Sequence, residues 1–215
     1  LGGIAGITPT EVVILGAGTA AEFAARAALG LGATVKVFDD SIKRLSDLQN
    51  ILGQRLYTSI FHPQVLEKVL KTADVVIGTL TPEEIKGGFI VSEELVKLMK
   101  KGSVIIDLSI DKGGCFETSE MRDNTNPAFI KHDVIHFCVP NITSRVARTA
   151  SIAMSNVFSP IITEIGEAGG MKTLLKDDQG IRHGVYIFNG ILTNDYLGRL
   201  YNIPSRDINL LMAAF

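Results

Sequence analysis

The stretch Glu11–Asp40, EVVILGAGTAAEFAARAALGLGATVKVFDD, decides the fold. It opens with the segment Glu11–Leu15, which is apolar without interruption from Val12 onward, as is typical of a strand covered on both faces. The Ala-rich segment Thr19–Leu31 favours a helix, and the alternating segment Thr34–Phe38 favours a second strand. A strand, a helix and a second strand within about 30 residues predict a parallel βαβ unit.

The turn between the first strand and the helix carries a G-x-G-x-x-A motif. Gly16 permits the tight turn, Gly18 lets a pyrophosphate approach the backbone, and Ala21 allows the helix to pack closely on the strand. The helix opens at Thr19 and Ala20, where free N–H groups and the positive dipole attract phosphate. Because the motif follows an apolar strand and opens a helix, it predicts a dinucleotide site.

An acidic residue stands where such sites hold the adenosine ribose. Asp39 lies 23 residues after Gly16, at the expected end of the second strand, where a carboxylate binds both ribose hydroxyls and repels a 2′-phosphate. Asp40 is the competing candidate, and the alternation of VKVFDD favours Asp39, whose alternative role is to cap the next helix. The pattern predicts NAD as cofactor, although Lys43 and Arg44 weaken the exclusion of NADP.

The alternation of strands and helices continues to about residue 140. Predicted strands at Arg55–Thr58, Asp74–Ile77, Ser103–Leu108 and Val134–Val139 alternate with predicted helices at Ile42–Leu52, Gln64–Lys71 and Glu93–Met99. Apolar strands separated by helices indicate a parallel sheet covered on both faces, so the predicted fold class is α/β, a doubly wound Rossmann sheet.

The pattern changes beyond residue 140. Ser144–Glu167 is expected to form one long crossover helix. The basic pair Arg145 and Arg148 lies at its start and could touch substrate, cofactor or a neighbouring subunit. A hairpin is expected around Asn189-Gly190. We therefore predict a Rossmann domain at 1–143, the crossover helix at 144–170, and a helical and hairpin segment of a split second domain at 171–215, which is too short to fold alone.

Composition narrows the possible partners. The 215-residue chain has a net charge of −2, which argues against nucleic acid as a partner. It lacks an apolar stretch of about 18 residues, so no membrane span is expected. The two cysteines show neither metal-ligand spacing nor a disulfide framework, and the first residues do not resemble a signal peptide, so the cytoplasm is the expected location. A start at Leu1 indicates processing or a piece of a longer protein.

The histidines and cysteines are expected to have structural and not catalytic or metal-binding roles. His132 and His136 lie in the run KHDVIHFCV, which looks like one strand, where residues four apart are about 13 Å from each other. No metal site is therefore expected. Cys115 and Cys138 are expected to be small buried apolar residues rather than nucleophiles.

A second cluster of polar residues follows the predicted strand Ser103–Leu108. Asp107, Asp111, a Gly-Gly pair and Cys115 lie at the carboxyl edge of the predicted sheet, where open α/β folds place ligands. The alternative is a polar strand end followed by a Gly-Gly turn. Spacing alone leaves both interpretations open.

The residues of this cluster and its surroundings resemble the alanine dehydrogenase family. The similarity rests on GAGTAAEFAARAALGLGATVKVFD, SVIIDLSIDKGGCFETS and VIHFCVPNITSRVARTAS, and it runs from residue 1 to about Ile165 and more loosely to the end. It implies NAD as cofactor, oxidative deamination of L-alanine to pyruvate and ammonia with hydride transfer to NAD, and a homo-oligomer, a hexamer in this family. The run 81–91 and the triplet Asn141-Ile142-Thr143 depart from the family's usual sequence.

The resemblance also assigns site residues. Asp111 matches the active-site aspartate beside the nicotinamide, Asp39 the ribose acid and Arg44 the basic residue near it. The remaining matches line the cofactor after successive strands: Thr79, Leu80, Ile110, Val139, Asn141 and Ile142.

Members of this family are about twice as long, and their other half carries the catalytic His with a substrate-binding Lys and Arg. The chain is therefore expected to bind NAD(H) and to be inactive alone. Alternatives are the nucleotide domain of a transhydrogenase-like or lysine-dehydrogenase-like relative, or a non-enzymatic NAD-binding module.

Overall fold

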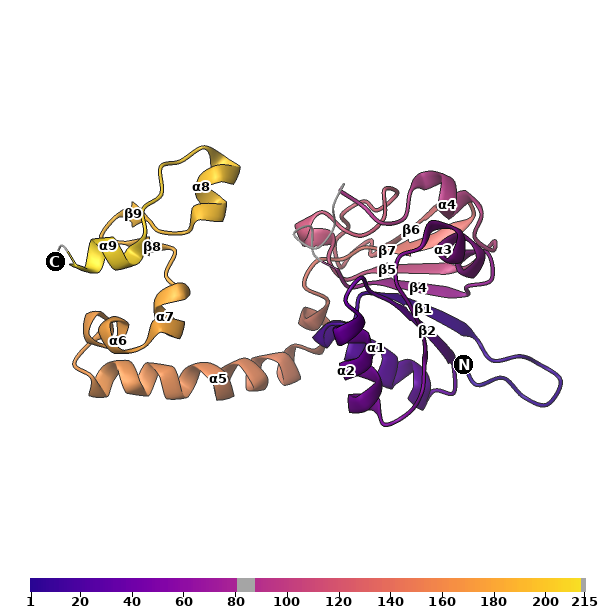
Figure 1. The fold of residues 1–215 in the computed structure, drawn as a ribbon, viewed down its shortest axis with the longest axis horizontal. Helices are drawn as coiled ribbons and strands as arrows, with labels where there is room; N and C mark the ends of the chain where they lie inside the picture. Colours follow the sequence, from indigo (N-terminus) through magenta and orange to yellow (C-terminus); the bar gives the residue numbers. More distant parts are fainter. Residues whose placement is uncertain (81–87, 214–215) are drawn as a thin grey trace. The chain divides into compact units, whose positions relative to one another are not determined.

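The computed structural model describes residues 1–80 and 88–213 and divides the chain into two compact units, Leu1–Ile142 and Thr143–Phe215 (Figure 1). Among the described residues, no helix is both long enough and apolar enough to cross a membrane.

The first unit is built on one twisted sheet. Within the described residues its strands are β1 (Glu11–Leu15), β2 (Thr34–Phe38), β3 (Tyr57–Ser59), β4 (Val75–Gly78), β5 (Val104–Asp107), β6 (Ala128–Lys131) and β7 (Val134–Phe137). They lie in the order β3-β2-β1-β4-β5-β7-β6, and every pair is parallel except β6 with β7. The predicted doubly wound α/β fold is confirmed.

Helices cover both faces of this sheet, α1 (Thr19–Gly30) and α2 (Ile42–Leu52) on one face and α3 (Pro63–Leu70) and α4 (Glu93–Lys97) on the other (Figure 1). Strand β1 serves both layers because successive side chains point to opposite faces. Val12 and Ile14 belong to the core with α1 and α2, whereas Val13 and Leu15 belong to the core with α3 and α4. This explains why β1 is an unbroken apolar run.

The helix ends follow the signals in the sequence. The Ser41 hydroxyl accepts a hydrogen bond from the backbone N–H of Arg44 at the start of α2, and Gly53 ends that helix in the left-handed conformation, with φ 67°. Ser92 caps α4 in the same way, and Pro63 occupies the first turn of α3.

The region around β7 corrects one expectation. The run 131–139 is not a single strand, because His132 (φ 53°) and Asp133 (φ 59°) form a tight turn between antiparallel β6 and β7. Two successive left-handed residues suit a two-residue hairpin. The pair His132-Asp133 lacks the usual Asn-Gly signal of a hairpin turn, so the sequence does not predict β6. Strand β7 ends at Phe137, two residues before the predicted end at Val139.

The second unit contains α5 (Ala147–Glu167), α6 (Met171–Asp177), α7 (Gln179–His183), β8 (Ile187–Phe188), β9 (Ile191–Leu192), α8 (Asp195–Tyr201) and α9 (Ile208–Ala213). The long helix begins three residues later than expected, since Ile142–Val146 form a 3₁₀ turn. The predicted hairpin at Asn189-Gly190 is confirmed. A small core of Leu175, Phe188, Ile208 and Leu211 joins these short elements.

Candidate dinucleotide-binding site

The site lies at the carboxyl edge of the sheet, between β1 and β4. The chain leaves β1 toward β2 on one side, whereas β4 lies on the other side, so the strand order reverses here. In open α/β sheets this switch point is where a ligand enters, because the two outgoing loops diverge. The β1–α1 turn and the residues after β2, β4, β5 and β7 all lie at this edge.

Gly16 forms the turn that the motif predicts. Its φ of 110° strains any residue with a side chain, and a Cβ would collide with Thr79 and approach Leu80 Cγ at 3.1 Å. The Thr79 hydroxyl donates to the carbonyl of Leu15 at 2.8 Å, which ties the end of β4 to β1. The predicted contacts Thr79 and Leu80 therefore flank the glycine turn directly.

Gly18 has a different reason to be glycine. It has an ordinary φ of −87°, and a Cβ built on it would meet nothing within 4 Å. Among the described residues no side chain caps α1, so the first N–H groups of the helix, at Thr19 and Ala20, have no side-chain acceptor. Ala21 is fully buried against the sheet. An open cradle before an uncapped helix N-terminus suits a pyrophosphate.

Asp39 is fully buried at the end of β2. Its Oδ2 accepts a 2.8 Å hydrogen bond from the N–H of Ala17, and its Oδ1 accepts one of 2.7 Å from the N–H of Ser41. The Arg44 Nε lies 3.2 Å from the same Oδ1, and the Arg44 side chain is 41% exposed. Ser41, not Asp39, caps α2, and Asp40 is exposed. The geometry favours Asp39 over Asp40 as the acid of the site.

A polar network fills the loop after β5. The buried carboxylate of Asp107 accepts four hydrogen bonds, from the N–H and hydroxyl of Ser109, the N–H of Cys115 and the hydroxyl of Ser119. Asp111 lies on the 3₁₀ turn Ile110–Lys112 inside this loop and is exposed. The two acids of this cluster therefore lie in different surroundings. Asp107 is buried among hydrogen-bond donors, whereas Asp111 is exposed.

The segment after β7 completes the edge. Cys138 and Val139 are buried, Asn141 adopts a left-handed φ of 52°, and Ile142 is half-buried. The Cys138 thiol donates to the Ser119 hydroxyl at 3.6 Å, and burial raises the pKa of this thiol. Both cysteines are buried, as the sequence predicts.

A family model, alanine dehydrogenase/PNT, C-terminal domain, matches residues 1–195. The chain belongs to this family. It is 36% identical over 209 residues to an alanine dehydrogenase of Staphylococcus saprophyticus, and 35% identical over the same length to alanine dehydrogenase 2 of Staphylococcus aureus. Each alignment covers 97% of this chain and 56% of the relative, so the chain spans about half the length of these relatives.

Solved structures agree with this membership. An L-alanine dehydrogenase structure matches with a TM-score of 0.85 at 33% identity, covering 94% of this chain and 55% of that one. A transhydrogenase from Sinorhizobium meliloti matches with a TM-score of 0.64 at 24% identity, covering 77% of this chain and 48% of that one, which shows a shared fold alone.

Two loops were expected to depart from the usual sequence of the family, the run 81–91 and the triplet after β7. Residues 81–87 lie outside the described part of the chain. The triplet Asn141-Ile142-Thr143 follows β7, and Asn141 adopts a left-handed conformation there. Asn tolerates this conformation better than most residues do.

The histidines of β7 and of the turn before it have structural partners. Buried His136 donates from Nδ1 to the Val134 carbonyl at 3.0 Å, which leaves Nε2 to accept from the Thr118 hydroxyl at 2.8 Å. Burial lowers the pKa of His136. The Nε2 atom of His132 lies 2.6 Å from Oε1 of Glu93. Among the described residues, no group of three His, Cys, Asp or Glu could hold a metal ion.

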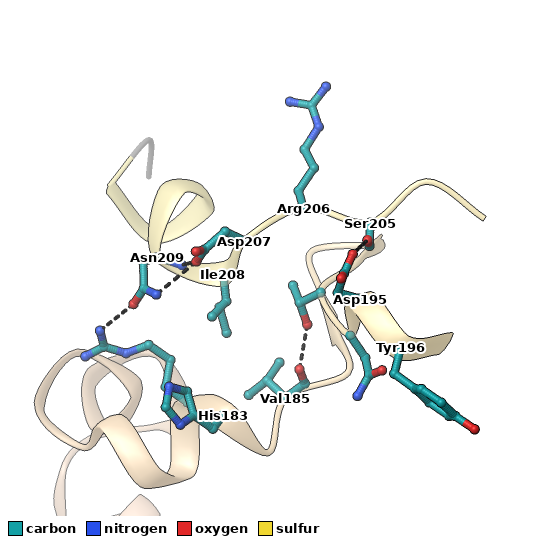
Figure 2. A pocket seen from close by; sticks show the side chains of 12 residues that line it. His183, Val185, Asp195, Tyr196, Ser205, Arg206, Asp207, Ile208 and Asn209 are labelled. Carbon is teal, nitrogen blue, oxygen red and sulfur yellow. Dashed lines mark hydrogen bonds between the residues drawn. The ribbon is translucent and has the colours of Figure 1, made fainter. Parts of the chain in front are cut away.

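The second unit has a polar pocket of about 490 Å³, shown in Figure 2. Its lining side chains mostly bind one another: Asn209 joins Arg182 and Asp207, while Ser205 donates to Asp195. Arg182 also donates to the carbonyls of Leu175 and Lys176. The polar residues that line this pocket therefore have a structural role: their hydrogen bonds hold α7, α8 and α9 together.

Proposed function

We propose that this chain is the NAD(H)-binding part of an alanine dehydrogenase. The observation that carries the proposal is the open cradle at Gly18 beside the buried carboxylate of Asp39, in a chain of this family. The residues present fit the cofactor: an uncapped helix N-terminus for the pyrophosphate and an acid for the ribose.

Asp39 would bind the hydroxyls of the adenosine ribose. Because its carboxylate is fully buried, these hydroxyls reach it only when a neighbour moves, and half-exposed Arg44 is the side chain able to do so. The bonds from Ala17 and Ser41 come from the backbone and remain in place. A charge-assisted bond to a carboxylate contributes about 1.5–3 kcal/mol, so Asp39 is expected to matter strongly for affinity.

The nicotinamide end would lie on the opposite side of β1. Strand β5 is three strands away from β2, a distance of about 14 Å at the usual strand spacing. The cofactor would cross this edge over the glycine turn. The residues proposed to line its nicotinamide end are Thr79, Leu80, Ile110, Val139, Asn141 and Ile142.

NAD, when bound, supplies the acceptor for a hydride. The role of Asp111 is to place a carboxylate beside the reacting carbon of the substrate, where it orients substrate or water and offsets the positive charge that develops during oxidation of an amine. Its exposed position on a short turn fits a residue that meets substrate.

The complete protein would oxidise L-alanine to pyruvate and ammonia. Because the chain spans about half of its relatives, the general acid and base for this reaction would come from the rest of the polypeptide. Residues 171–215 would belong to that substrate domain, with 144–170 as the crossover. We expect a cytoplasmic homo-oligomer, a hexamer as in the family, which light scattering on the complete protein would test.

The test compares the isolated chain with a longer protein that restores the missing length. The chain should bind NADH and give no alanine-dependent NADH production, whereas the longer protein should give it. Alanine-dependent activity of the chain alone contradicts the proposal. Hydride exchange between two nucleotides without alanine would favour the transhydrogenase alternative instead.

A further inference from the structure

We infer that Asp107 is a positioning residue for the nicotinamide end of the site. This inference rests on the proposed function, since it assigns Asp107 a role in shaping the loop that carries Asp111. The loop leaves β5 at Asp107 and runs through Ser119. Its regular structure among the described residues is limited to the turn Ile110–Lys112 and a backbone bridge between Phe116 and Val91. Side-chain contacts must therefore hold the rest of its shape.

The carboxylate of Asp107 supplies those contacts. Oδ1 accepts from the N–H and hydroxyl of Ser109, at 3.2 and 3.1 Å, on the near side of Asp111. Oδ2 accepts from the N–H of Cys115 at 2.9 Å and the hydroxyl of Ser119 at 2.7 Å, on the far side. One carboxylate thus fixes both ends of the segment that presents Asp111.

The carboxylate and the backbone of the loop are closely packed. A Cβ on Gly114 would stand 2.5 Å from Asp107 Oδ2, and a Cβ on Gly78 would stand 2.8 Å from Cys115 Cβ. The Cys115 thiol donates to the carbonyl of Leu80, a residue proposed to line the cofactor. The Asp107 network therefore connects the ends of β4 and β5 directly.

The network extends to β7 as well. The Ser119 hydroxyl, which donates to Asp107, accepts a bond from the Cys138 thiol at the end of β7. The loops after β4, β5 and β7 are the nicotinamide side of the proposed site, whereas Asp39 lies beyond β1. Asp107 is buried and has no path to substrate, so it acts through the backbone that it holds.

The test uses Asp107→Asn in the full 215-residue chain, with NADH and ADP-ribose as probes. ADP-ribose keeps the adenosine and pyrophosphate and lacks the nicotinamide. An amide has one acceptor oxygen, and Ser109 and Cys115 present N–H groups to opposite oxygens of Asp107, so either orientation leaves one backbone N–H facing a donor. The exposed replacement Asp47→Asn is the matched control.

NADH affinity should fall by about tenfold or more in Asp107→Asn, whereas ADP-ribose affinity should stay within about twofold and the control should match wild type. If Asp107→Asn does not fold, Ser119→Ala provides the test, because it removes one hydrogen-bond donor to Asp107. This variant should also lose NADH affinity while keeping ADP-ribose affinity, by a smaller factor than Asp107→Asn. Equal losses for both probes, or none for NADH, overturn the inference. If the wild-type chain does not bind NADH, the proposed function fails and the inference fails with it. If the wild-type chain binds NADH and Asp107→Asn shows no selective loss, the inference alone fails.

Discussion

The backbone N–H of Ala17 donates a 2.8 Å hydrogen bond to Oδ2 of Asp39. This bond joins the glycine turn after β1 to the end of β2, which are 22 residues apart in sequence. The two parts of the proposed site, the phosphate cradle and the ribose acid, are therefore held together before any ligand binds. Preorganisation of this kind reduces the cost of binding.

The two motif glycines should respond differently to the same change. Gly16→Ala is expected to destabilise the fold by more than 1 kcal/mol, because φ is 110° and the added Cβ meets Thr79. Gly18→Ala should leave the melting temperature nearly unchanged and weaken NADH binding, because its Cβ enters open space that the pyrophosphate would fill. Thermal melts and NADH titrations check this, and normal NADH affinity in Gly18→Ala would contradict the cradle.

Asp39→Asn should weaken NADH binding by about tenfold or more, since it removes a charged acceptor for ribose hydroxyls. It should also lower stability by about 1–3 kcal/mol, because either orientation of the amide leaves the N–H of Ala17 or Ser41 without an acceptor. Asp40→Asn, at the exposed neighbour, is the control. A larger loss at Asp40 than at Asp39 would reverse the assignment.

Asp111→Asn should separate binding from chemistry. The side chain is exposed, so the chain should fold and bind NADH with affinity close to wild type. In the longer, active protein the same substitution should lower kcat strongly, because the charge beside the developing positive centre is lost. Steady-state rates and NADH titrations measure the two effects, and unchanged kcat would remove Asp111 from the mechanism.

His136 should make stability depend on pH. Burial holds the pKa of His136 below its usual value of 6.5, so over part of the pH range the unfolded chain binds a proton that the folded chain does not. The stability is present above pH 6.5 and is lost as pH falls from there toward the lowered pKa, by at most about 1.4 kcal/mol per pH unit. Urea unfolding of wild type and His136→Gln across this range should give a steeper fall for wild type, and parallel curves would refute the effect.

The sequence predicts the parallel part of the fold well because the signals there are local. The apolar run at β1, the hydroxyl cap at Ser41 and the left-handed glycine at Gly53 each act within a few residues. Strand β6 was missed because its edge position buries few side chains and its turn uses His132 and Asp133, which carry no strong turn signal. The sequence predicts the start of α5 at Ser144, three residues too early, because the 3₁₀ turn Ile142–Val146 leads directly into the helix.

Local patterns in the sequence predict the members of the proposed site, whereas the contacts among them appear only in the folded structure. The spacing of Gly16, Gly18 and Asp39 predicts a nucleotide site, since each residue has a local reason to be there. The role of Asp107 depends on donors 2, 8 and 12 residues away that converge only after folding. Likewise, the pairing of Asp39 with Ala17 needs the register of β1 and β2, which no local pattern specifies.

The most direct test of the account is a titration of the folded 215-residue chain with NADH, followed by competition with ADP-ribose. We predict saturable binding of one NADH per chain, displaced by ADP-ribose, because the cradle and the ribose acid lie within the first unit. A chain that is folded by circular dichroism and binds no NADH would contradict the central claim.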